Sequence, residues 1–306
     1  MEEKIYIAIL HYKTIEKTKK CVNSILDISS KYHILVVDNN SGDGTLEELM
    51  DTYKDIKNIE FLPIKKNIGF AGANNRALES LRQKGVKYAI LSNNDIIFKK
   101  NSIEGLINVL KSDKSIAIAA PRVRDPQNSI QNTTESIRKS ILTILIGRLN
   151  FFAKLCKRST SYHYPAEVKQ FHGCCFACNL ELMKEMDDFD SQTFLYYEEA
   201  ILEEKIRAHH FKIFYVPQAE VIHEHGATTH SVFKYKIHGY MMESELYYLV
   251  KYRHVNLHIL NTFYKLKMKR HERMYHSKEL ENMELEIIQN MKENKFLIFS
   301  NKVKED

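Results

Sequence analysis

No stretch of this 306-residue sequence contains the roughly 18 consecutive apolar residues that a membrane-spanning helix needs. A signal-peptide pattern is also missing, because residues 1–4 lead directly into a strand-like segment. Internal repeats and long low-complexity linkers are absent as well. The hydrophobic content of 44% and the charged content of 27% are typical of soluble globular proteins. We therefore expect a cytoplasmic protein with one large α/β domain, with or without an appendage.

Cysteine is scarce, and its spacing argues against a disulfide framework. There are five cysteines, an odd number, and three of them cluster at Cys174, Cys175 and Cys178. A second ligand pair at zinc-finger spacing is missing. We interpret the three as small buried thiols in a core strand, with a zinc site as the alternative. Disulfides are not expected in a reducing compartment.

The sequence lacks both common glycine-rich nucleotide fingerprints. Residues 67–75 contain Gly69 and Gly72 and precede a predicted helix, but they have neither the Gly-Lys-Ser/Thr ending of a Walker loop nor dinucleotide-fold spacing. Free N–H groups at a helix N-terminus favour phosphate. The segment is therefore a weak sign of a phosphate site, and a structural loop is the alternative.

Positive charge is unevenly distributed in this sequence. The net charge is only +6, but Lys and Arg crowd the last third, for example at residues 265–270, with aromatic residues between them. This pattern suits a surface near anionic lipid, and it suits a solvated helix face equally well. No recognised nucleic-acid-binding motif is present, so we expect no nucleic-acid partner.

Strand and helix patterns alternate in the first half of the chain, which predicts a largely parallel sheet. Strands are expected at residues 5–10, 34–37, 59–62, 88–95 and 116–120, and helices at 14–26, 45–53 and 73–84. Thr45, with Glu48 three residues on, predicts a capped helix start, and Pro121 is expected to close the last of these strands.

The second half is less regular. Residues 125–165 are poorly patterned and predict a helical or mobile insertion. Further on, we expect strands at 169–179, 211–216 and 221–222, a helix at 199–209, and a helical, basic and aromatic region after residue 230.

Small polar residues follow two of the predicted strands. Asn93, Asn94 and Asp95 end one apolar strand, and Asp38 closes another. Open α/β sheets bind ligands at the carboxyl ends of their strands. Hard cations such as Mg²⁺ or Mn²⁺ favour one or two carboxylates plus substrate phosphates, so Asp95 indicates a metal-and-phosphate site, with a polar turn as the alternative. Asp38 indicates a contact with a nucleotide, with a turn cap as the alternative.

Two later groups of residues offer acid–base or metal chemistry. Glu198 and Glu199 stand where a loop enters a predicted helix, so one of them can act as a general base. The alternative is that both carboxylates are there because negative charge at a helix N-terminus interacts favourably with the helix dipole. His223 and His225 follow a short strand with a spacing that faces both the same way, and one of them can complete the coordination begun by Asp95.

The order of these motifs resembles that of inverting family-two glycosyltransferases of the GT-A fold, especially the rhamnosyltransferase-like branch that builds bacterial surface polysaccharides. The resemblance covers roughly residues 5–231. It rests on VVDNNS at 36–41, NIGFAGAN at 67–74, LSNND at 91–95, Gly173, FD at 189–190, FLYYEE at 194–199 and His223.

The resemblance implies roles for individual residues. Asp38 would bind the nucleotide base or ribose, Asp95 would be the metal-binding Asp of the DxD-type motif, and His223 would support the metal. Glu199 would be the catalytic base, with Glu198 as the alternative. The nucleotide-sugar pocket would further be lined by Asn40, Asn67, Gly69, Asn74, Asn93, Asn94 and Gly173.

The resemblance also implies an organisation and an activity. Residues 1–230 would form the GT-A domain, with a nucleotide-binding half at 1–98 and an acceptor half at 99–230, and 231–306 a helical basic C-terminal region. A metal-dependent, inverting transfer is implied, from a dTDP- or UDP-linked sugar to a hydroxyl of a glycan or lipid-linked acceptor, with Mn²⁺ or Mg²⁺ as cofactor. The C-terminal region is expected to touch the inner face of the plasma membrane peripherally, or a second subunit in a homodimer.

The sequence departs from the family pattern near its proposed chemistry. Asn93 replaces the first acidic residue of the DxD-type motif, Glu199 replaces an Asp, and Ile201 stands where the family has another acidic residue. Glu is one methylene longer than Asp, and a small misplacement of a base costs rate. These departures leave open a degenerate GT-A domain that serves as a binding or scaffolding module. A nucleotidyltransferase is a further alternative, although residues 10–13 offer little of its glycine- and basic-rich loop.

Overall fold

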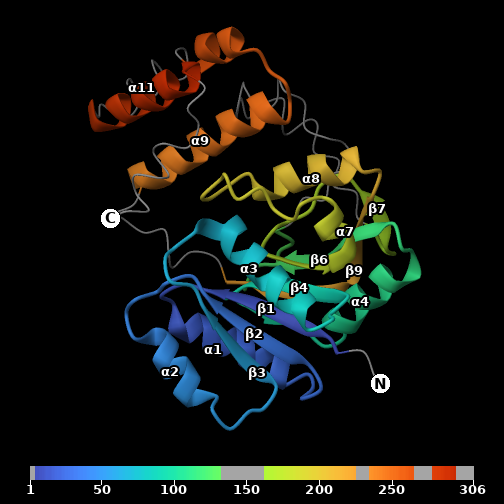
Figure 1. Ribbon diagram of the computed structural model, residues 1–306. Coiled ribbons are helices and arrows are strands. Elements are labelled where there is room, and N and C mark those ends of the chain that lie inside the picture. Colours follow the sequence, from blue (N-terminus) through green and yellow to red (C-terminus); the bar gives the residue numbers. More distant parts are fainter. Residues whose placement is uncertain (1–3, 132–161, 225–233, 265–277, 294–306) are drawn as a thin grey trace.

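The computed structural model describes residues 4–131, 162–224, 234–264 and 278–293. Its centre is one sheet with the strand order β3-β2-β1-β4-β8-β6-β9-β5, in which β7 pairs with β9. Helices lie on both faces of this sheet (Figure 1). The expected α/β class, with a central sheet flanked by helices, is confirmed.

Four strands of the N-terminal half pair in parallel. They are β1 (Tyr6–His11), β2 (His33–Asp38), β3 (Ile59–Pro63) and β4 (Tyr88–Asn93). Side chains along β1 alternate between two apolar clusters, with Ile7 and Ile9 on one face and Tyr6 and Ala8 on the other. Burial on both faces explains why these strands read as continuous apolar runs in the sequence.

Each face of the sheet is covered by its own helices. The first face packs against α1 (Ile15–Leu26), α2 (Thr45–Thr52) and α4 (Ser102–Ser112), and the second against α3 (Gly69–Gln83), α7 (Leu180–Glu185) and α8 (Glu198–Ala208). The apolar sides of α1 and α4 repeat at helical spacing, which is why these segments fold as amphipathic helices.

The C-terminal half of the sheet is mixed. Strand β8 (Cys175–Asn179) lies antiparallel between β4 and β6 (Ile116–Arg124). Strand β9 (Lys212–His223) runs parallel to β6 and antiparallel to the short strands β5 (Ile96–Phe98) and β7 (Ala166–Val168). This arrangement brings the end of β9 next to the turn after β4.

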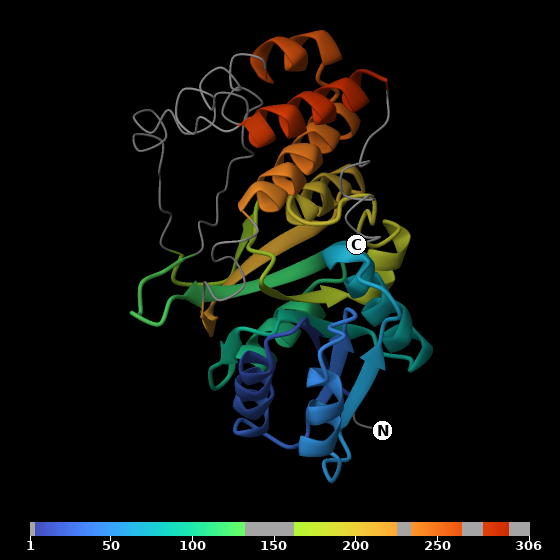
Figure 2. The ribbon, with the colours of Figure 1, turned by 90° about the vertical axis from the view of Figure 1, so that its left-hand side faces the viewer.

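The described part of the C-terminal region is helical. Helices α9 (Lys234–Lys251) and α11 (Lys278–Lys292) stack beyond α8, at the end of the molecule away from α1 and α2 (Figures 1 and 2). An apolar cluster joins Ile201 of α8 to Leu246 and Leu249 of α9 and to Ile287 of α11. No helix in the described ranges is long and apolar enough to cross a membrane. The basic run at 265–270 lies outside the described residues.

Several predicted boundaries are wrong, because tertiary contacts override local signals. Strand β6 continues through Pro121 and shifts its register on β9 just after it, an irregularity of the kind that tolerates proline. The predicted strands at 211–216 and 221–222 are one strand, β9, and the predicted strand at 169–179 is a loop followed by β8. Most of the predicted insertion at 125–165 lies outside the described residues.

One helix cap and one helix start also differ from the prediction. Helix α2 begins after Gly44, and the Asp43 carboxylate accepts the backbone N–H of Thr45 at 3.2 Å, so Thr45 is not the cap. Helix α3 begins at Gly69 instead of residue 73. The glycine-rich segment therefore forms the first turns of this helix and is not a free loop in front of it.

Candidate active site

Strand register brings several predicted site residues to one edge of the sheet. His11 at the end of β1 pairs with Asp38 at the end of β2, and Leu10 pairs with Asn93 at the end of β4. Strand β8 begins at the same edge, since Cys175 pairs with Ser92. Ligands of open α/β sheets bind at this edge.

Asp95 lies in the turn between β4 and β5. The strand was predicted to end at Asp95, but β4 ends two residues earlier, at Asn93. Its Oδ1 is 3.2 Å from Nε2 of His223, which pairs with Ile96 across the β5–β9 ladder. Its Oδ2 accepts from Nζ of Lys17 on α1 at 3.2 Å. Burial raises the pKa of Asp95, but the nearby imidazole and ammonium outweigh burial and hold this pKa below its ordinary value.

The surroundings of His223 suit a cation between it and Asp95. Nδ1 of His223 lies 3.2 Å from Oε1 of Gln131, an acceptor, so Nδ1 carries a proton, and Nε2, which faces the carboxylate, can serve as the ligand atom once its own proton has left. Oδ1 of Asp95 is buried and receives no well-aligned hydrogen bond from the described residues. Two ligand atoms at right angles around Mn²⁺ or Mg²⁺ stand roughly 3 Å apart, so this pair fits such an ion. Gln131 orients the imidazole, as metal-bound histidines usually require.

Lys17 is a site residue that sequence reasoning missed. Besides Asp95, its ammonium donates to the backbone oxygen of Glu224 at 3.0 Å, and its side chain is only 14% exposed. One lysine on an amphipathic helix carries no sequence signal of its own. The contact depends on packing between α1 and the β4–β5 turn, which places a positive charge beside the Asp95 carboxylate.

Glu199 lies close to Gly173, as expected for two residues that were predicted to line the same pocket. A Cβ atom at position 173 would be 2.4 Å from Cγ and 2.6 Å from Oε1 of Glu199. The glutamate therefore fills the space above the glycine, at the start of α8 and beside the loop that leads into β8. Glu199 also contributes to the negative field that raises the pKa of Cys174 after burial, as does Asp95.

We expect Gly173→Ala to lower the sugar transfer that the family resemblance implies roughly 100-fold, because the new methyl group displaces Glu199, the implied base, and misplacement of a reacting group by about 1 Å has this cost. Binding of the nucleotide, followed by thermal shift, should change little. Gly105→Ala on α4 is the control, since its nearest neighbour is 3.4 Å from the added carbon. Equal transfer by the two variants would show that the position of Glu199 does not matter.

Glu198 differs from its neighbour in being fully buried. It is 5% exposed, and its Oε1 has no hydrogen-bond partner among the described residues. Burial, and then repulsion by Glu199, raise its pKa to about 8. This carboxyl is therefore largely protonated at neutral pH in the folded protein.

The raised pKa of Glu198 predicts a pH-dependent stability difference. The folded state holds this proton up to pH of about 8 while the unfolded chain releases it near 4.5, so stability falls as pH rises between these values. The free energy of unfolding of Glu198→Gln should therefore match that of the parent near pH 5. Near pH 8.5 it should exceed that of the parent by more than about 1 kcal/mol, so the variant unfolds at a higher urea concentration. Glu181→Gln, on an exposed position of α7, should give no such pH-dependent difference. If the difference in unfolding free energy between Glu198→Gln and the parent is the same at both pH values, the pKa of Glu198 is not raised.

Asp38 is placed at the sheet edge, but part of its carboxylate is already used. It accepts from the backbone N–H of Ser41 at 3.2 Å and from the Ser41 hydroxyl at 2.5 Å. This is the turn cap that the sequence left open as the alternative, and it orients the carboxylate at the edge. Asn40, in the turn between them, is exposed and has a positive φ of 61°.

Asn39, which the sequence analysis did not single out, organises the segment before α3. Its amide donates to Oδ1 of Asn67 at 2.9 Å and accepts the N–H of Ile68 at 3.0 Å. Asn67 in turn accepts the N–H of Gly69 at 3.0 Å. The end of β2 and the start of α3 are thereby fixed to each other.

Some predicted pocket residues have structural contacts. At Gly69, φ is 76° and a Cβ would lie 2.4 Å from the backbone oxygen of Phe194, so this glycine is required by the loop that leads to α8. Asn74 donates to Phe70 within α3 at 3.0 Å, and Asn94 donates to Thr14 and Thr18 of α1 at 2.7 and 2.9 Å. Their roles as ligands stay predictions. His225 lies outside the described residues.

The cysteines of the described residues are buried free thiols, as expected. They are Cys21, Cys174, Cys175 and Cys178. Cys175 and Cys178 lie in β8, in the core of the sheet. Cys174 precedes β8 and lies at the sheet edge near His223.

The chain is similar to known glycosyltransferases. The profile described as Glycosyl transferase family 2 matches residues 6–186. Over 210 residues the chain is 25% identical to N-acetylglucosaminyl-diphospho-decaprenol L-rhamnosyltransferase of Mycobacterium tuberculosis, in strains CDC 1551 and H37Rv, with 64% of this chain and 67% of the relative covered.

Solved glycosyltransferase structures share the fold. GalNAc-T7 with UDP, GalNAc and Mn²⁺ matches 95% of this chain with a TM-score of 0.63. The mannosyltransferase PcManGT of Pyrobaculum calidifontis, with GDP-Man and Mn²⁺, matches 82% with a TM-score of 0.56. Both are 14% identical, and this chain spans 56% and 65% of their lengths. The likeness therefore identifies the GT-A fold and nothing further.

Proposed function

Because this chain belongs to glycosyl transferase family 2 and is a glycosyltransferase, we propose that it moves a sugar from a dTDP- or UDP-linked donor to a hydroxyl of a glycan or lipid-linked acceptor, with inversion. The observation that carries the proposal is the pair formed by Asp95 and His223 at the sheet edge, with the loop before β8 and the start of α8 beside it. The mycobacterial relative is named for a lipid diphosphate acceptor, which supports a lipid-linked acceptor here.

The donor would lie across the carboxyl edge of β1, β2 and β4. Asp38, held by Ser41, would accept from the base or ribose, and the exposed Asn40 lies in the same turn. The ammonium of Lys17 would face the diphosphate. Asn67, Gly69, Asn74, Asn93 and Asn94 would shape the rest of the donor pocket.

Asp95 and His223 would hold Mn²⁺ or Mg²⁺, since a buried carboxylate oxygen and an imidazole nitrogen 3.2 Å apart fit such an ion. When bound, the ion stabilises the charge on the departing diphosphate. Both solved glycosyltransferase structures contain Mn²⁺. Lys17, which also contacts Asp95, adds to the effect of His223 in holding the pKa of this carboxylate below its ordinary value.

Glu199 would be the general base, and the acceptor half of the pocket would form above Gly173. Its carboxylate would take the proton of an acceptor hydroxyl as that oxygen attacks the anomeric carbon from the face opposite the nucleotide. Glu198, buried and protonated at neutral pH, is less suited to this step. The protonated Glu198 adds no second negative charge beside Glu199.

A thermal-shift panel of nucleoside diphosphates and their sugars, with and without Mn²⁺, tests this proposal. A ligand that binds the native state raises its melting temperature. Metal-dependent stabilisation by UDP or dTDP, followed by donor hydrolysis or transfer, is the expected result. No stabilisation by any nucleotide with metal present would favour a degenerate GT-A module, for which Asn93, Glu199 and Ile201 are the relevant departures. Pyrophosphate release from nucleoside triphosphates would instead indicate a nucleotidyltransferase.

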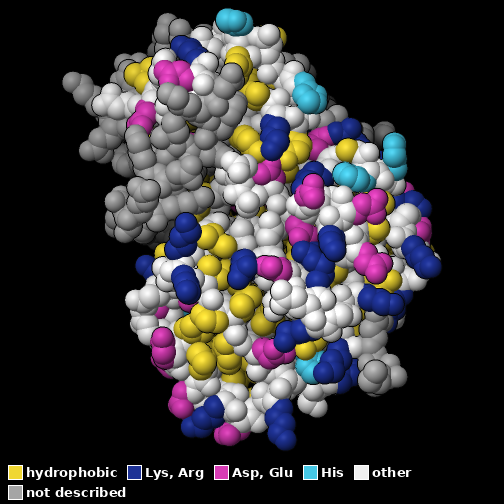
Figure 3. Space-filling model, in the orientation of Figure 1, with side chains coloured by type: hydrophobic (Ala, Val, Ile, Leu, Met, Phe, Trp, Pro, Cys, Tyr) yellow, Lys and Arg dark blue, Asp and Glu magenta, His cyan; other side chains and the backbone are white. Residues whose placement is uncertain are grey.

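We further propose peripheral attachment of the C-terminal region to the inner face of the plasma membrane. On the face shown in Figure 3, Lys and Arg are interspersed with Asp and Glu, so this face offers no single-sign field. The support is instead the basic sequence at 265–270, where each charge near an anionic surface contributes about 1 kcal/mol. Anionic liposomes should bind the intact chain more strongly than a chain that ends at residue 264. Equal binding, or a dimer interface mapped to this region, would remove the membrane from the account.

A further inference from the structure

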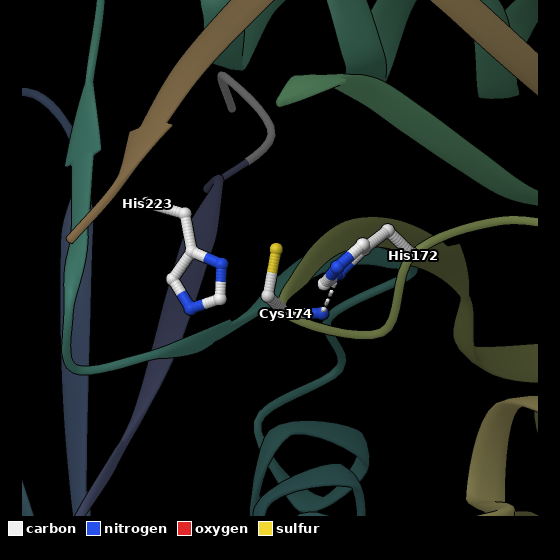
Figure 4. A group of neighbouring side chains, drawn as sticks. All are labelled: His172, Cys174 and His223. Atoms are coloured by element: carbon white, nitrogen blue, oxygen red, sulfur yellow. Dashed lines mark hydrogen bonds between the residues drawn. The ribbon is translucent and has the colours of Figure 1, made fainter. Parts of the chain in front are cut away.

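Two residues that the donor chemistry does not use lie beside His223. They are His172 and Cys174, in the loop that leads into β8, and Figure 4 shows their side chains gathered with the imidazole of His223. One ligand atom from each of the three residues lies within 4.8 Å of the other two. The rings of His172 and His223 meet edge to face, with centroids 5.7 Å apart. Since His223 also faces Asp95, the four residues form one continuous group.

The backbone holds this group in place from two sides. His223 is fixed at the end of β9 by its pairing with Ile96 and by Gln131. His172 is fixed to the opposite loop, where its Nδ1 accepts the N–H of Cys174 at a long 3.3 Å. The thiol of Cys174 is buried between these anchors, 3% exposed for the residue. Small movements of the loop side chains suffice to bring three donors to one ion.

The chemistry of this donor set differs from that of a magnesium site. Two imidazoles and a thiolate are ligands of Zn²⁺ and Co²⁺, whereas Mg²⁺ and Mn²⁺ prefer carboxylate, carbonyl and water oxygens. Three protein ligands leave one coordination position of the ion open, which is typical of catalytic zinc sites, whereas structural zinc sites have four protein ligands. Asp95, which lies beside His223, can offer an oxygen for that open position. Alternatively, Asp95 and His223 together can hold Mn²⁺ or Mg²⁺.

We propose that His172, Cys174 and His223 form a site for a borderline-soft divalent ion, Zn²⁺ or Co²⁺, which overlaps the Asp95–His223 site through the shared imidazole. On binding, a metal–sulfur bond forms, the thiol proton of Cys174 leaves to solvent, and the two imidazoles bind as neutral ligands. If Nδ1 is the ligand atom of His172, its long hydrogen bond to the backbone is exchanged for the metal. The site therefore selects among divalent ions, which goes beyond the proposed use of Mn²⁺ or Mg²⁺.

Titration of the reduced, metal-free protein with Co²⁺ tests this site. We expect near-ultraviolet absorption from a cobalt–thiolate bond, saturating at one equivalent, and its loss on addition of Zn²⁺. Cys174→Ser should abolish this band, and His172→Gln should weaken Zn²⁺ binding at least about 10-fold. Cys178→Ser is the matched control, because Cys178 is an equally buried thiol on β8 that pairs with Ala89 away from the edge. Circular dichroism verifies that each variant is folded, with Cys174→Ala as a second variant.

Metal selectivity provides an independent measurement. Cys174→Ser should lower the affinity for Zn²⁺ at least about 10-fold while changing the affinity for Mn²⁺ less than about 3-fold, since Mn²⁺ gains little from sulfur. Co²⁺ that binds without the near-ultraviolet band, a band that persists in Cys174→Ser, or no binding of Co²⁺ would each overturn the proposal. The experiment uses no sugar nucleotide, so its failure leaves sugar transfer untouched, and a failure of transfer leaves the cobalt spectrum unaffected.

Discussion

Asp95→Ala is expected to reduce sugar transfer roughly 1,000-fold, a loss of about 4 kcal/mol in stabilisation of the transition state. The carboxylate is the one acidic group of the DxD-type segment at 93–95, because Asn93 and Asn94 occupy its first two positions. Its loss would also leave Lys17 and His223 facing each other without an anion, so Mn²⁺ would have a single remaining ligand of the proposed pair. Transfer rates and the Mn²⁺-dependent thermal shift by the nucleotide should fall together.

The control for Asp95→Ala is Asp51→Ala, which removes an exposed carboxylate that pairs with Lys54 on the surface. This variant should transfer sugar at the parent rate. If Asp95→Ala keeps the metal-dependent shift, the ion is held elsewhere. If it keeps near-normal transfer as well, the enzyme does not use an ion at Asp95.

Glu199→Gln is expected to lower turnover by about 10²- to 10⁴-fold while nucleotide binding is retained, because an amide of the same shape cannot accept the proton. The substitution preserves the volume above Gly173, so the packing of this loop should not change. Single-turnover rates and the thermal shift separate these effects. The rate should fall without a parallel loss in the shift.

Glu198→Gln is the matched comparison at the adjacent position. Its side chain is buried and protonated at neutral pH, so the amide should be tolerated with a transfer rate within about 10-fold of the parent. Near-normal turnover of Glu199→Gln together with a large loss in Glu198→Gln would reverse the two roles. Transfer would then rise with pH up to about 8, because the base would ionise only there.

The parallel half of the sheet was predictable because its signals are local. Ile34 to Val37 form a continuous apolar run, and only a strand that is buried on both faces needs one. The helices between such strands repeat their apolar residues at helical spacing, as α1 does through Cys21, Val22 and Ile25. Sequence periodicity reports this burial directly.

Boundaries failed where distant contacts decide them. Helix α3 starts at Gly69 because Phe194, far along the chain, accepts the N–H of Phe70 at 3.0 Å. Strand β9 continues between residues 216 and 221 because β6 pairs with it on both sides of an irregularity. Neither partner can be read from the local sequence.

The sequence by itself determined the fold class and the chemical types at the edge of the sheet. Asp95, Glu199 and His223 were predicted because carboxylates and imidazoles suit metal and proton chemistry, and because their order along the chain resembles that of the family. Only the tertiary structure decided which groups meet. Lys17 reaches Asp95, Gln131 orients His223, and His172 and Cys174 lie beside it. These contacts join residues tens of positions apart or more, because strand order and register set distances in space, and neither leaves a pattern in the local sequence.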